Sequence, residues 1–349
     1  MSLKKVRGFS AIGVWASIAY LVIALYYLVA GEPHTHARYM LYGVLLLFPY
    51  SVSVAYVASA LNRYHPWQIP IAAGVLLLAP APLVALSVGE EWANLLVVIA
   101  GFLGFASALY TASMKRGSVR LSLELAAAAS LLASVVAIVR QCFASGLLFS
   151  YYSLAMTLAY PVTLIHAVTV HALPSTFKDR PQGSASWLLP LLTLLGALLV
   201  LDRRVLLGAL AGISSVYVYV YAARLYRLGE YFRVASGFPE GPARGGAYYF
   251  LEGHVAVLIL VVIMTVYLAW PGCNVICRLH LYALGFSSLH VLIHGPMMLP
   301  VILGIRHRRR FNPSPYVLQL LAVLLFPFTG DGALVMYVLA ILASFAIVL

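Results

Sequence analysis

Histidine is the residue type in this sequence that is best suited to chemistry. Ten histidines occur although only 9% of the residues are charged, and most of them lie in or at the start of long apolar runs. An ionisable side chain in an apolar helix is costly in a membrane, so it usually faces the bundle interior and marks a site. For one such histidine, a hydrogen-bonded packing role is an equal alternative. The whole set predicts a site built on imidazole nitrogens.

The histidines form two groups by depth if the apolar runs cross a membrane in turn. The outer group is His34, His36 and His280. The inner group is His166, His171, His254, His290 and His294. His280 and His294 are about 40° apart around a helix and about 21 Å apart along it, so they share one face. Two haems held one above the other would need this arrangement.

The ligand types favour haem over zinc in the outer group. A zinc site uses three or four close ligands, often with Cys, Asp or Glu, and the outer group offers almost no carboxylate. Two imidazoles from facing helices suit a six-coordinate haem iron in an apolar slot. We therefore predict a b-type haem between His36 and His280. For the inner group we predict a second haem or copper.

Charged residues near the histidines have predicted roles as well. Arg38 follows His36 by two residues, and Arg278 precedes His280 by two. We predict that both arginines lie at the outer cofactor, where a guanidinium can pair with a haem propionate. Glu252 and Glu124 fall inside apolar runs, where they could carry protons or serve as polar packing residues at helix ends.

The composition indicates that membrane-spanning helices hold these histidines and charged residues. The chain has 349 residues, 63% of them hydrophobic, and a mean hydropathy of +0.96. A soluble domain carries roughly 25% charged residues. The chain is therefore predicted to be an all-α integral membrane protein, with one transmembrane domain over residues 1–349. A spanning helix needs about 20 residues, and the apolar runs predict twelve spans: 8–30, 37–61, 67–88, 93–113, 120–141, 148–173, 185–201, 204–226, 247–270, 275–304, 315–329 and 332–349.

The basic residues of the loops predict how the chain is oriented in the membrane. Twelve alternating spans place nearly all basic loop residues on one side: Lys4, Lys5, Arg7, Arg63, Lys115, Arg116, Arg120, Lys178, Arg180, Arg227, Arg233, Arg244 and the run at 306–310. Arg203 and Arg204 are the main exception. The positive-inside rule then places both termini in the cytoplasm of a multi-pass protein of the cell membrane. The net charge of +12 reflects these loops, so no nucleic-acid partner is expected. Cys142, Cys273 and Cys277 fall outside, where a disulfide could form.

Two families resemble parts of this chain. The stretch His36-Ala37-x-x-Met40-Leu41-Tyr42 resembles helix II of the haem–copper oxidase catalytic subunit, whose histidine ligates the low-spin haem with a partner from helix X, here His280. The 14-residue spacing also resembles that of dihaem b cytochromes. The oxidase resemblance implies twelve spans with a cytoplasmic N-terminus. It breaks down at the oxygen-reducing centre: AYPVTL at 159–164 has Tyr160 where a copper histidine is expected, and 187–201 lacks the paired histidines. Arg278 stands where the high-spin haem ligand should be.

The NnrS-type membrane haem proteins are the second resemblance. HARYMLYG at 36–43, HAVTVHALPSTFKDRP at 166–181 and LHLYALGFSSLHVLIHG at 279–295 are similar to regions of that family, in the same order. Spans 37–61, 148–173 and 275–304 also resemble one another, which predicts a threefold pseudo-repeat. The chain is identified as a divergent member of this joint superfamily.

These observations predict a membrane protein that transfers electrons in a respiratory chain. Quinol or an extracytoplasmic redox protein would exchange electrons with the outer haem. The chain would be an electron-transfer subunit of a quinol- or cytochrome-linked oxidoreductase, beside a respiratory partner subunit in the lipid bilayer. Two alternatives stay open. One is a haem-dependent protein that responds to nitric oxide or a metal, and the other is a proton-coupled secondary transporter.

Overall fold

The computed structural model describes residues 3–61, 65–144, 146–303, 311–329 and 331–348, and within these ranges the fold is helical without strands. Ten segments of this part of the chain are long and apolar enough to cross a membrane: Gly8–Val29, Pro33–Leu61, Gln68–Ser87, Glu90–Ser113, Gly117–Phe143, Phe149–Thr176, Gly183–Leu201, Val205–Ala222, Pro242–Ala269 and Val275–Met298. The predicted class, a multi-pass helical membrane bundle, is confirmed.

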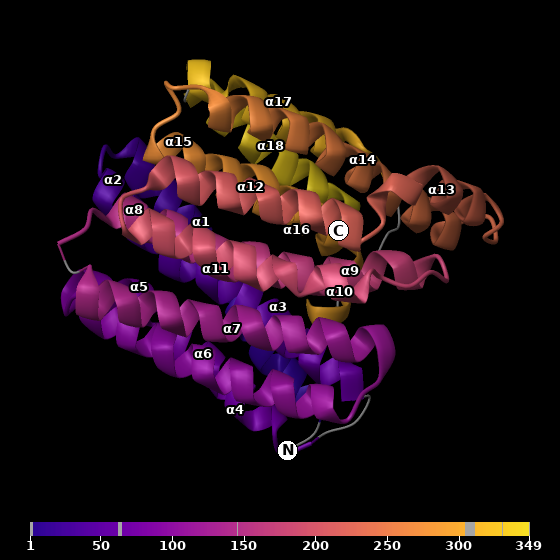
Figure 1. Ribbon diagram of the computed structural model, residues 1–349, viewed down its shortest axis with the longest axis horizontal. Coiled ribbons are helices and arrows are strands. Elements are labelled where there is room, and N and C mark those ends of the chain that lie inside the picture. The colour runs from indigo at the N-terminus through magenta and orange to yellow at the C-terminus, as the bar shows by residue number, and fades with distance from the viewer. Residues whose placement is uncertain (1–2, 62–64, 145, 304–310, 330, 349) are drawn as a thin grey trace.

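The helices run roughly side by side (Figure 1). The first half contains α1 (Leu3–Val29), α2 (Pro33–Arg38), η1 (Tyr39–Leu46), α3 (Leu47–Leu61), α4 (Gln68–Leu78), α5 (Ala81–Ser87), α6 (Glu90–Ser113), α7 (Gly117–Phe143), α8 (Phe149–Thr157), η2 (Leu158–Val162) and α9 (Thr163–Thr176). The second half contains α10 (Gly183–Ser186), α11 (Leu188–Leu201), α12 (Val205–Ala222), η3 (Leu225–Arg227), α13 (Leu228–Ser236), α14 (Pro242–Ala269), α15 (Val275–His280), η4 (Leu281–Ser287), α16 (Ser288–Leu303), α17 (Ser314–Thr329) and α18 (Asp331–Val348).

The last two predicted spans are the shortest in the structure. They correspond to α17 and α18, whose described apolar segments, Ser314–Phe328 and Val335–Ser344, are shorter than the other ten. The count of twelve and the location of the termini stay predictions. The basic residues at Arg63 and 306–310, used for the predicted orientation, lie outside the described residues.

Three spans contain a wide helical turn. The π-helices η1, η2 and η4 interrupt the second, sixth and tenth spans, and η2 contacts both η1 and η4. π-Helical turns are rare and occur mostly at functional sites, because the extra residue per turn redirects the side chains that follow. Pro161 lies inside η2, where it removes one backbone donor. The spans with these turns are the three that resemble one another in sequence.

The two ends of the bundle differ in character. α2, α8 and α15 lie at one end and α13 lies at the other (Figure 1). We name the first the outer end and the second the inner end, because the loop charges predict that the first faces away from the cytoplasm. Cys273 and Cys277 form a disulfide at the outer end, between α14 and the first turn of α15. A disulfide persists in an oxidising compartment, in agreement with the predicted orientation.

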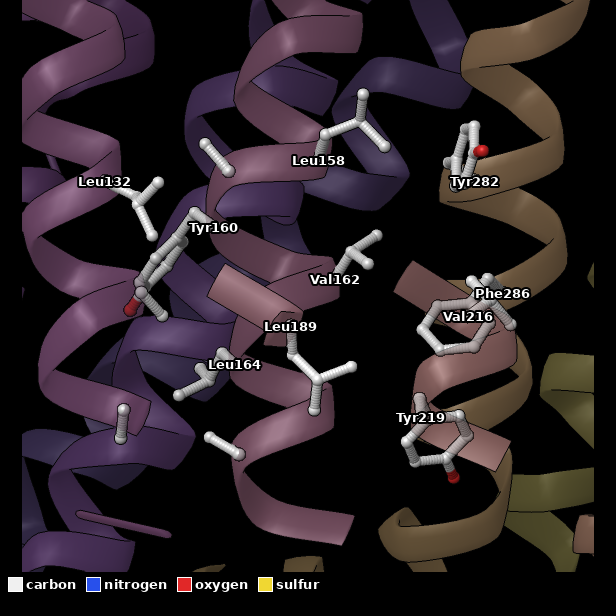
Figure 2. Packing of buried hydrophobic residues seen from close by; sticks show 14 of the residues in the cluster. Leu132, Leu158, Tyr160, Val162, Leu164, Leu189, Val216, Tyr219, Tyr282 and Phe286 are labelled. Carbon is white, nitrogen blue, oxygen red and sulfur yellow. The ribbon is translucent and has the colours of Figure 1, made fainter. Parts of the chain in front are cut away.

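Tyrosines fill much of the space between the helices. Tyr42, Tyr50, Tyr152, Tyr160, Tyr219, Tyr249 and Tyr282 are all almost fully buried. Figure 2 shows part of this packing, with Tyr219 of α12 beside Phe286 of η4. Several of these hydroxyls donate to backbone carbonyls of a neighbouring helix, such as Tyr50 to Ala100 and Tyr282 to Ala209. Such bonds satisfy polar groups in a core that excludes water.

Candidate functional site

His36 and His280 lie at the outer end on facing spans. The Nδ1–H of His36 donates to the carbonyl of Ala24 at 2.9 Å, and that of His280 donates to the carbonyl of Ile276 at 2.7 Å. Metal-bound histidines commonly donate their second ring nitrogen to a backbone carbonyl in this way. Both Nε2 atoms therefore keep their lone pairs as ligands.

The helix faces that carry these two histidines continue into an apolar cavity. Below His36, the residues at successive turns are Met40, Val44, Phe48 and Val52, and all four line the cavity. Residues about one turn apart share a helix face. One face of the second span, from α2 through η1 into α3, therefore carries His36 at its outer end and lines the cavity further inward.

The opposite wall repeats this pattern on the tenth span. Leu284, Ser287, Val291 and His294 follow His280 at steps of three or four residues, and all four line the cavity. His280 itself lines a smaller cavity that shares Leu284 and Tyr337 with the larger one. The cavity thus lies directly inward of the His36–His280 pair, between the faces that carry them.

The larger cavity is a slot between five spans. Its walls come from the first, second, sixth and tenth spans and from α18, and most of the lining side chains are apolar. It leaves about 200 Å³ free for the centres of water molecules, and about 1510 Å³ between atoms when its open mouth is included. Binding clefts for organic ligands commonly measure roughly 300–1,000 Å³. The enclosed space is smaller than that range, and its apolar lining suits an apolar group better than a single ion.

Arg38 faces away from this slot. Its guanidinium lies 2.7 Å from a carboxylate oxygen of Glu90, and a second arginine, Arg140, lies 3.8 Å from the other oxygen. The Arg38 guanidinium also lies 5.6 Å from the ring of Phe149. Two residues correspond to about 200° around a helix, so His36 and Arg38 point to opposite sides. Arg38 is therefore paired with Glu90 in this structure, and its predicted place at the edge of a haem stays a prediction.

Arg278 lies in α15, one turn from Tyr282. Its charge interacts with the Tyr282 hydroxyl, and its buried Nε has no hydrogen-bond partner among the described residues. Half a turn separates it from His280, as for Arg38 and His36. Neither arginine lines the cavity.

Three inner histidines come together at the other end of the slot. The ring centroids are 6.3 Å apart for His254–His290, 6.4 Å for His254–His294 and 6.4 Å for His290–His294. We call these three residues the histidine triad. His290 and His294 line the cavity, whereas His254 is completely buried behind them. His294 of α16 thus lies beside His254 of α14, a histidine from a different span.

Hydrogen bonds fix the protonation of two triad rings. The Nδ1–H of His254 donates to the carbonyl of Phe250 at 2.7 Å, and that of His290 donates to the carbonyl of Phe286 at 2.8 Å. The Nε2 of each neutral ring is therefore an acceptor. For His290 the donor is the Tyr219 hydroxyl at 3.1 Å.

Thr169 connects the third triad ring to this network. Its hydroxyl shares a hydrogen bond of 3.1 Å with the Nε2 of His294 and lies within hydrogen-bonding reach of Tyr219. His166 stacks on Tyr219 with ring centroids 5.0 Å apart and is completely buried. Its two nitrogens have no hydrogen-bond partner in the part of the chain that the structure describes.

The remaining predicted inner residues lie elsewhere. His171 shares a 2.9 Å hydrogen bond with Ser118 of α7, so it is turned away from the triad. No three His, Cys, Asp or Glu side chains of the described ranges are placed to hold one metal ion. Tyr160, at the position where the oxidase resemblance expects a copper ligand, points towards α7 and away from Tyr219 (Figure 2). An inner metal therefore stays a prediction.

The two predicted proton-carrying carboxylates differ in their surroundings. Glu124 pairs with Arg120 one turn away at 2.7 Å, which is the environment of a helix-end ion pair. Glu252 is partly buried two residues before His254, and its charge interacts with Tyr249 and Tyr316. Only Glu252 lies on the helix that carries a triad member.

Sequence reasoning missed several residues of this site. Tyr219 and Thr169 contact the triad, yet each is one of many hydroxyl residues in apolar runs, so nothing in the sequence distinguishes them. Glu90 and Arg140 were given no role by the sequence, and Arg140 falls inside the predicted span 120–141. A carboxylate near the end of one apolar span and an arginine near the end of the next can be predicted to pair, because charges at such positions are usually paired.

Comparison of the chain with protein-family models, with curated proteins and with solved structures gave no match.

Proposed function

We propose that this chain binds a b-type haem between His36 and His280 and transfers electrons in the membrane. The observation that carries this proposal is the continuity between the two histidines and the apolar slot. The helix faces that present the two Nε2 atoms are the same faces that line the cavity inward of them. Two imidazole nitrogens next to an apolar cavity are what a six-coordinate haem requires.

The residues present fit such a group. His36 and His280 would supply the axial nitrogens, each oriented by its bond to a backbone carbonyl. A haem bound there would supply a one-electron carrier. Met40 and Phe48 would exclude water from its face, and Phe326, stacked on His280 with centroids 4.6 Å apart, would hold that ring in place.

The resemblance to the haem–copper oxidase and NnrS superfamily supports the same assignment. His36 and His280 occupy the second and tenth spans at the outer end, as the oxidase resemblance implies. The absence of histidine at Tyr160 and in the seventh span argues against an oxygen-reducing centre. We therefore propose electron transfer without oxygen reduction, in the plasma membrane and beside a respiratory partner subunit.

The position of the histidine pair favours an electron donor at the outer surface. His36 and His280 are each partly exposed near the outer end of the bundle. A quinol in the outer leaflet or an extracytoplasmic redox protein would approach within a short distance of the cofactor. The donor class is thus part of the proposal.

One observation favours a second candidate, proton-coupled transport. The histidine triad lies at membrane depth, where titratable residues serve proton movement in transporters. A transporter would not need the apolar slot next to His36 and His280. Bound haem in the purified protein favours electron transfer, whereas a colourless protein that moves a substrate with protons favours transport.

The test is the absorption spectrum of the purified chain, oxidised and reduced with dithionite, before and after substitution. His36→Ala and His280→Ala should each remove the same low-spin haem signal, because a bis-imidazole iron loses its six-coordinate state when either ligand is absent. Added imidazole should restore part of the signal in either variant by filling the space that was left.

Two control variants make this test specific. His171→Ala removes a membrane histidine outside the slot and should leave the spectrum unchanged. Phe48→Trp narrows the slot without touching an iron ligand and should lower the haem content. Unaltered spectra in both ligand variants at full haem occupancy would show that the assignment is wrong.

A further inference from the structure

Four polar side chains connect the second span with the start of α6 at the outer end of the bundle. Arg38 and Tyr42 lie four residues apart on the second span, and Glu90 and Asn94 lie four residues apart on α6. Arg38 lies 2.7 Å from Glu90, and the hydroxyl of Tyr42 donates to the side-chain oxygen of Asn94 at 2.8 Å. Residues four apart share a helix face, so the two pairs join one face of each helix. We call these four residues the polar seam.

The polar seam lies on the side of the second span opposite to His36. Two residues separate His36 from Arg38, which places them about 200° apart around the helix. Met40, one turn after His36, lines the cavity, whereas Arg38 and Tyr42 face α6. A rotation of this helix about its axis would move the seam and the histidine together. The contacts of the seam thus determine the direction in which His36 points.

Few other contacts fix the helix end that carries His36. None of the side chains of α2 is buried, and no side chain of the described residues caps its start. Its hydrogen bonds to other spans, within the part of the chain that the structure describes, are those of His36 to the Ala24 carbonyl and of Arg38 to Glu90. A helix end with few buried contacts opens at little cost in free energy. The orientation of α2 therefore depends strongly on the ion pair with Glu90.

The helix end that carries His280 is fixed by other means. Asn274 caps α15 by accepting from two backbone N–H groups of its first turn, both at 3.0 Å. The disulfide also joins Cys277 of that turn to Cys273. α2 has neither a side-chain cap nor a covalent link, so its ion pair with Glu90 has the corresponding role.

Glu90 is itself held in place by neighbouring helices. Arg140 of α7 lies 3.8 Å from its second carboxylate oxygen, and the side chain of that arginine is only 10% exposed. The positive end of the helix dipole further stabilises a carboxylate in the first turn of α6. Asn94 accepts a second hydrogen bond, from the Tyr152 hydroxyl of α8, at 2.8 Å. α7 and α8 thus support α6 at both levels of the polar seam.

We propose that Glu90 is a positioning residue, which through Arg38 directs His36 towards the haem of the proposed function. This inference rests on the proposed function, because His36 is an axial ligand there. Glu90 acts on the iron only through the histidine, by fixing the rotation of α2. Loss of its charge would leave Arg38 and Arg140 without their shared counter-ion and would allow the helix end to turn. His36 would then spend part of the time away from the iron.

The first measurement is the spectrum of the purified full-length protein, reduced with dithionite, with and without carbon monoxide. Carbon monoxide needs an open position on the haem iron, and two histidine ligands leave none, so the wild type should not bind it. Glu90→Gln and Arg38→Gln should each convert part of the haem to a form that binds carbon monoxide. The double variant should convert no more than either single variant, because both remove the same contact. Arg38→Lys, which keeps the charge, should convert less than Arg38→Gln.

The second measurement does not depend on haem. Hydrogen exchange followed by mass spectrometry reports how often the backbone of α2 opens. Glu90→Gln should accelerate exchange in peptides that cover residues 33–40 by about tenfold, the effect of losing a hydrogen bond to a charged group. Peptides of α15 should keep the wild-type rate. The matched control is Glu91→Gln, which removes an exposed carboxylate from the same turn of α6 and should change neither measurement.

Four outcomes would overturn the inference. A wild-type spectrum in both Glu90→Gln and Arg38→Gln, with no carbon monoxide bound, shows that the seam does not position the ligand, even if exchange in α2 is faster. Equal effects of Glu90→Gln and Glu91→Gln assign the change to surface charge. If Glu90→Gln fails to fold, as its elution profile would show, a wild-type spectrum in Arg38→Gln alone has the same meaning. A wild-type protein that lacks haem, or whose haem binds carbon monoxide, removes the proposed function as well.

Discussion

What a buried histidine can do depends on which ring nitrogen is already occupied. His36, His280, His254 and His290 each donate Nδ1–H to a backbone carbonyl, and in the last three the carbonyl lies four residues earlier. The bond fixes the tautomer and leaves Nε2 facing another span. The outer pair faces the proposed haem site with Nε2, whereas the inner rings face one another. The same hydrogen bond from Nδ1–H to a backbone carbonyl thus occurs both in the histidines proposed to bind haem and in the histidine triad.

Asp179 shows how one carboxylate connects several residues at the inner end. It accepts hydrogen bonds from Arg224 at 2.8 Å, from Arg227 at 2.6 Å and from the Tyr231 hydroxyl at 2.9 Å. Burial alone would raise the pKa of Asp179. The hydrogen bonds from the Arg180 backbone N–H and from Tyr231, with the charges of both arginines, outweigh burial and hold that pKa below its usual value.

Asp179→Asn should therefore destabilise the inner end. We expect a loss of about 1.5–3 kcal/mol at pH 7, the range for a hydrogen bond to a charged group. A depressed carboxylate pKa contributes stability above the unfolded-state pKa, and this contribution is lost as pH falls through the folded value. The difference between variant and wild type, measured by thermal unfolding in detergent, should shrink below about pH 4.

The matched control is Asp202→Asn. Asp202 pairs with Arg204 at 2.8 Å, but both side chains are 64% exposed. Exposed pairs contribute about 0–1 kcal/mol, so this variant should unfold near the wild-type temperature. Equal effects of the two substitutions would show that the contacts of Asp179 carry no special weight.

At the scale of elements, the close approach of α11 and α12 depends on two glycines. A Cβ on Gly208 would lie 2.7 Å from the carbonyl oxygen of Gly196, and a Cβ on Gly196 would lie 2.9 Å from that of Gly208. A Cβ on Gly208 would also meet Val200 Cγ2 at 2.6 Å, but the carbonyl oxygens are backbone atoms and cannot rotate away. Small residues allow such contacts between membrane helices, where packing replaces the hydrophobic effect as the driving force.

Gly208→Ala should thus push the two helices apart. The expected cost is about 1–3 kcal/mol, typical of overpacking, seen as a lower unfolding temperature in detergent. Gly229→Ala in α13 is the control, since a Cβ there meets nothing within 4 Å. Alanine in a helix gains up to about 1 kcal/mol over glycine, so this variant should be equal or more stable. A Gly208 variant as stable as the wild type would contradict the packing.

Apolar runs predicted the helices well because length and hydropathy alone decide whether a segment can span a membrane. The same runs contain no signal for the π-turns in η1, η2 and η4, which depend on tertiary packing. The convergence of His254, His290 and His294 followed from depth, since polar groups at one level of a bundle pair with one another. The ion pair between Arg38 and Glu90 could not be predicted in this way, because its two residues are 52 positions apart in the sequence.

At the scale of the whole molecule, charge is sorted along the bundle. Asp179 with its arginines lies at the end that carries α13, and the disulfide and Cys142 lie at the opposite end. The loops at the α13 end contain most of the described lysines and arginines. Positive loops stay in the cytoplasm during insertion, so this distribution predicts that the histidine pair faces outward and the histidine triad inward.

Thiol labelling of intact cells tests this orientation. Cys142 is a free and exposed cysteine at the outer end of α7, so a membrane-impermeant maleimide should modify it without permeabilisation. Gly229→Cys, in a Cys142→Ser background, places an exposed thiol on α13 at the inner end and should react only after permeabilisation. The disulfide should protect Cys273 and Cys277 until a reductant is added. Labelling of Gly229→Cys but not of Cys142 in intact cells would show that the bundle has the opposite orientation. The proposed haem site would then lie at the cytoplasmic surface, and neither quinol of the outer leaflet nor an extracytoplasmic protein could be its electron donor.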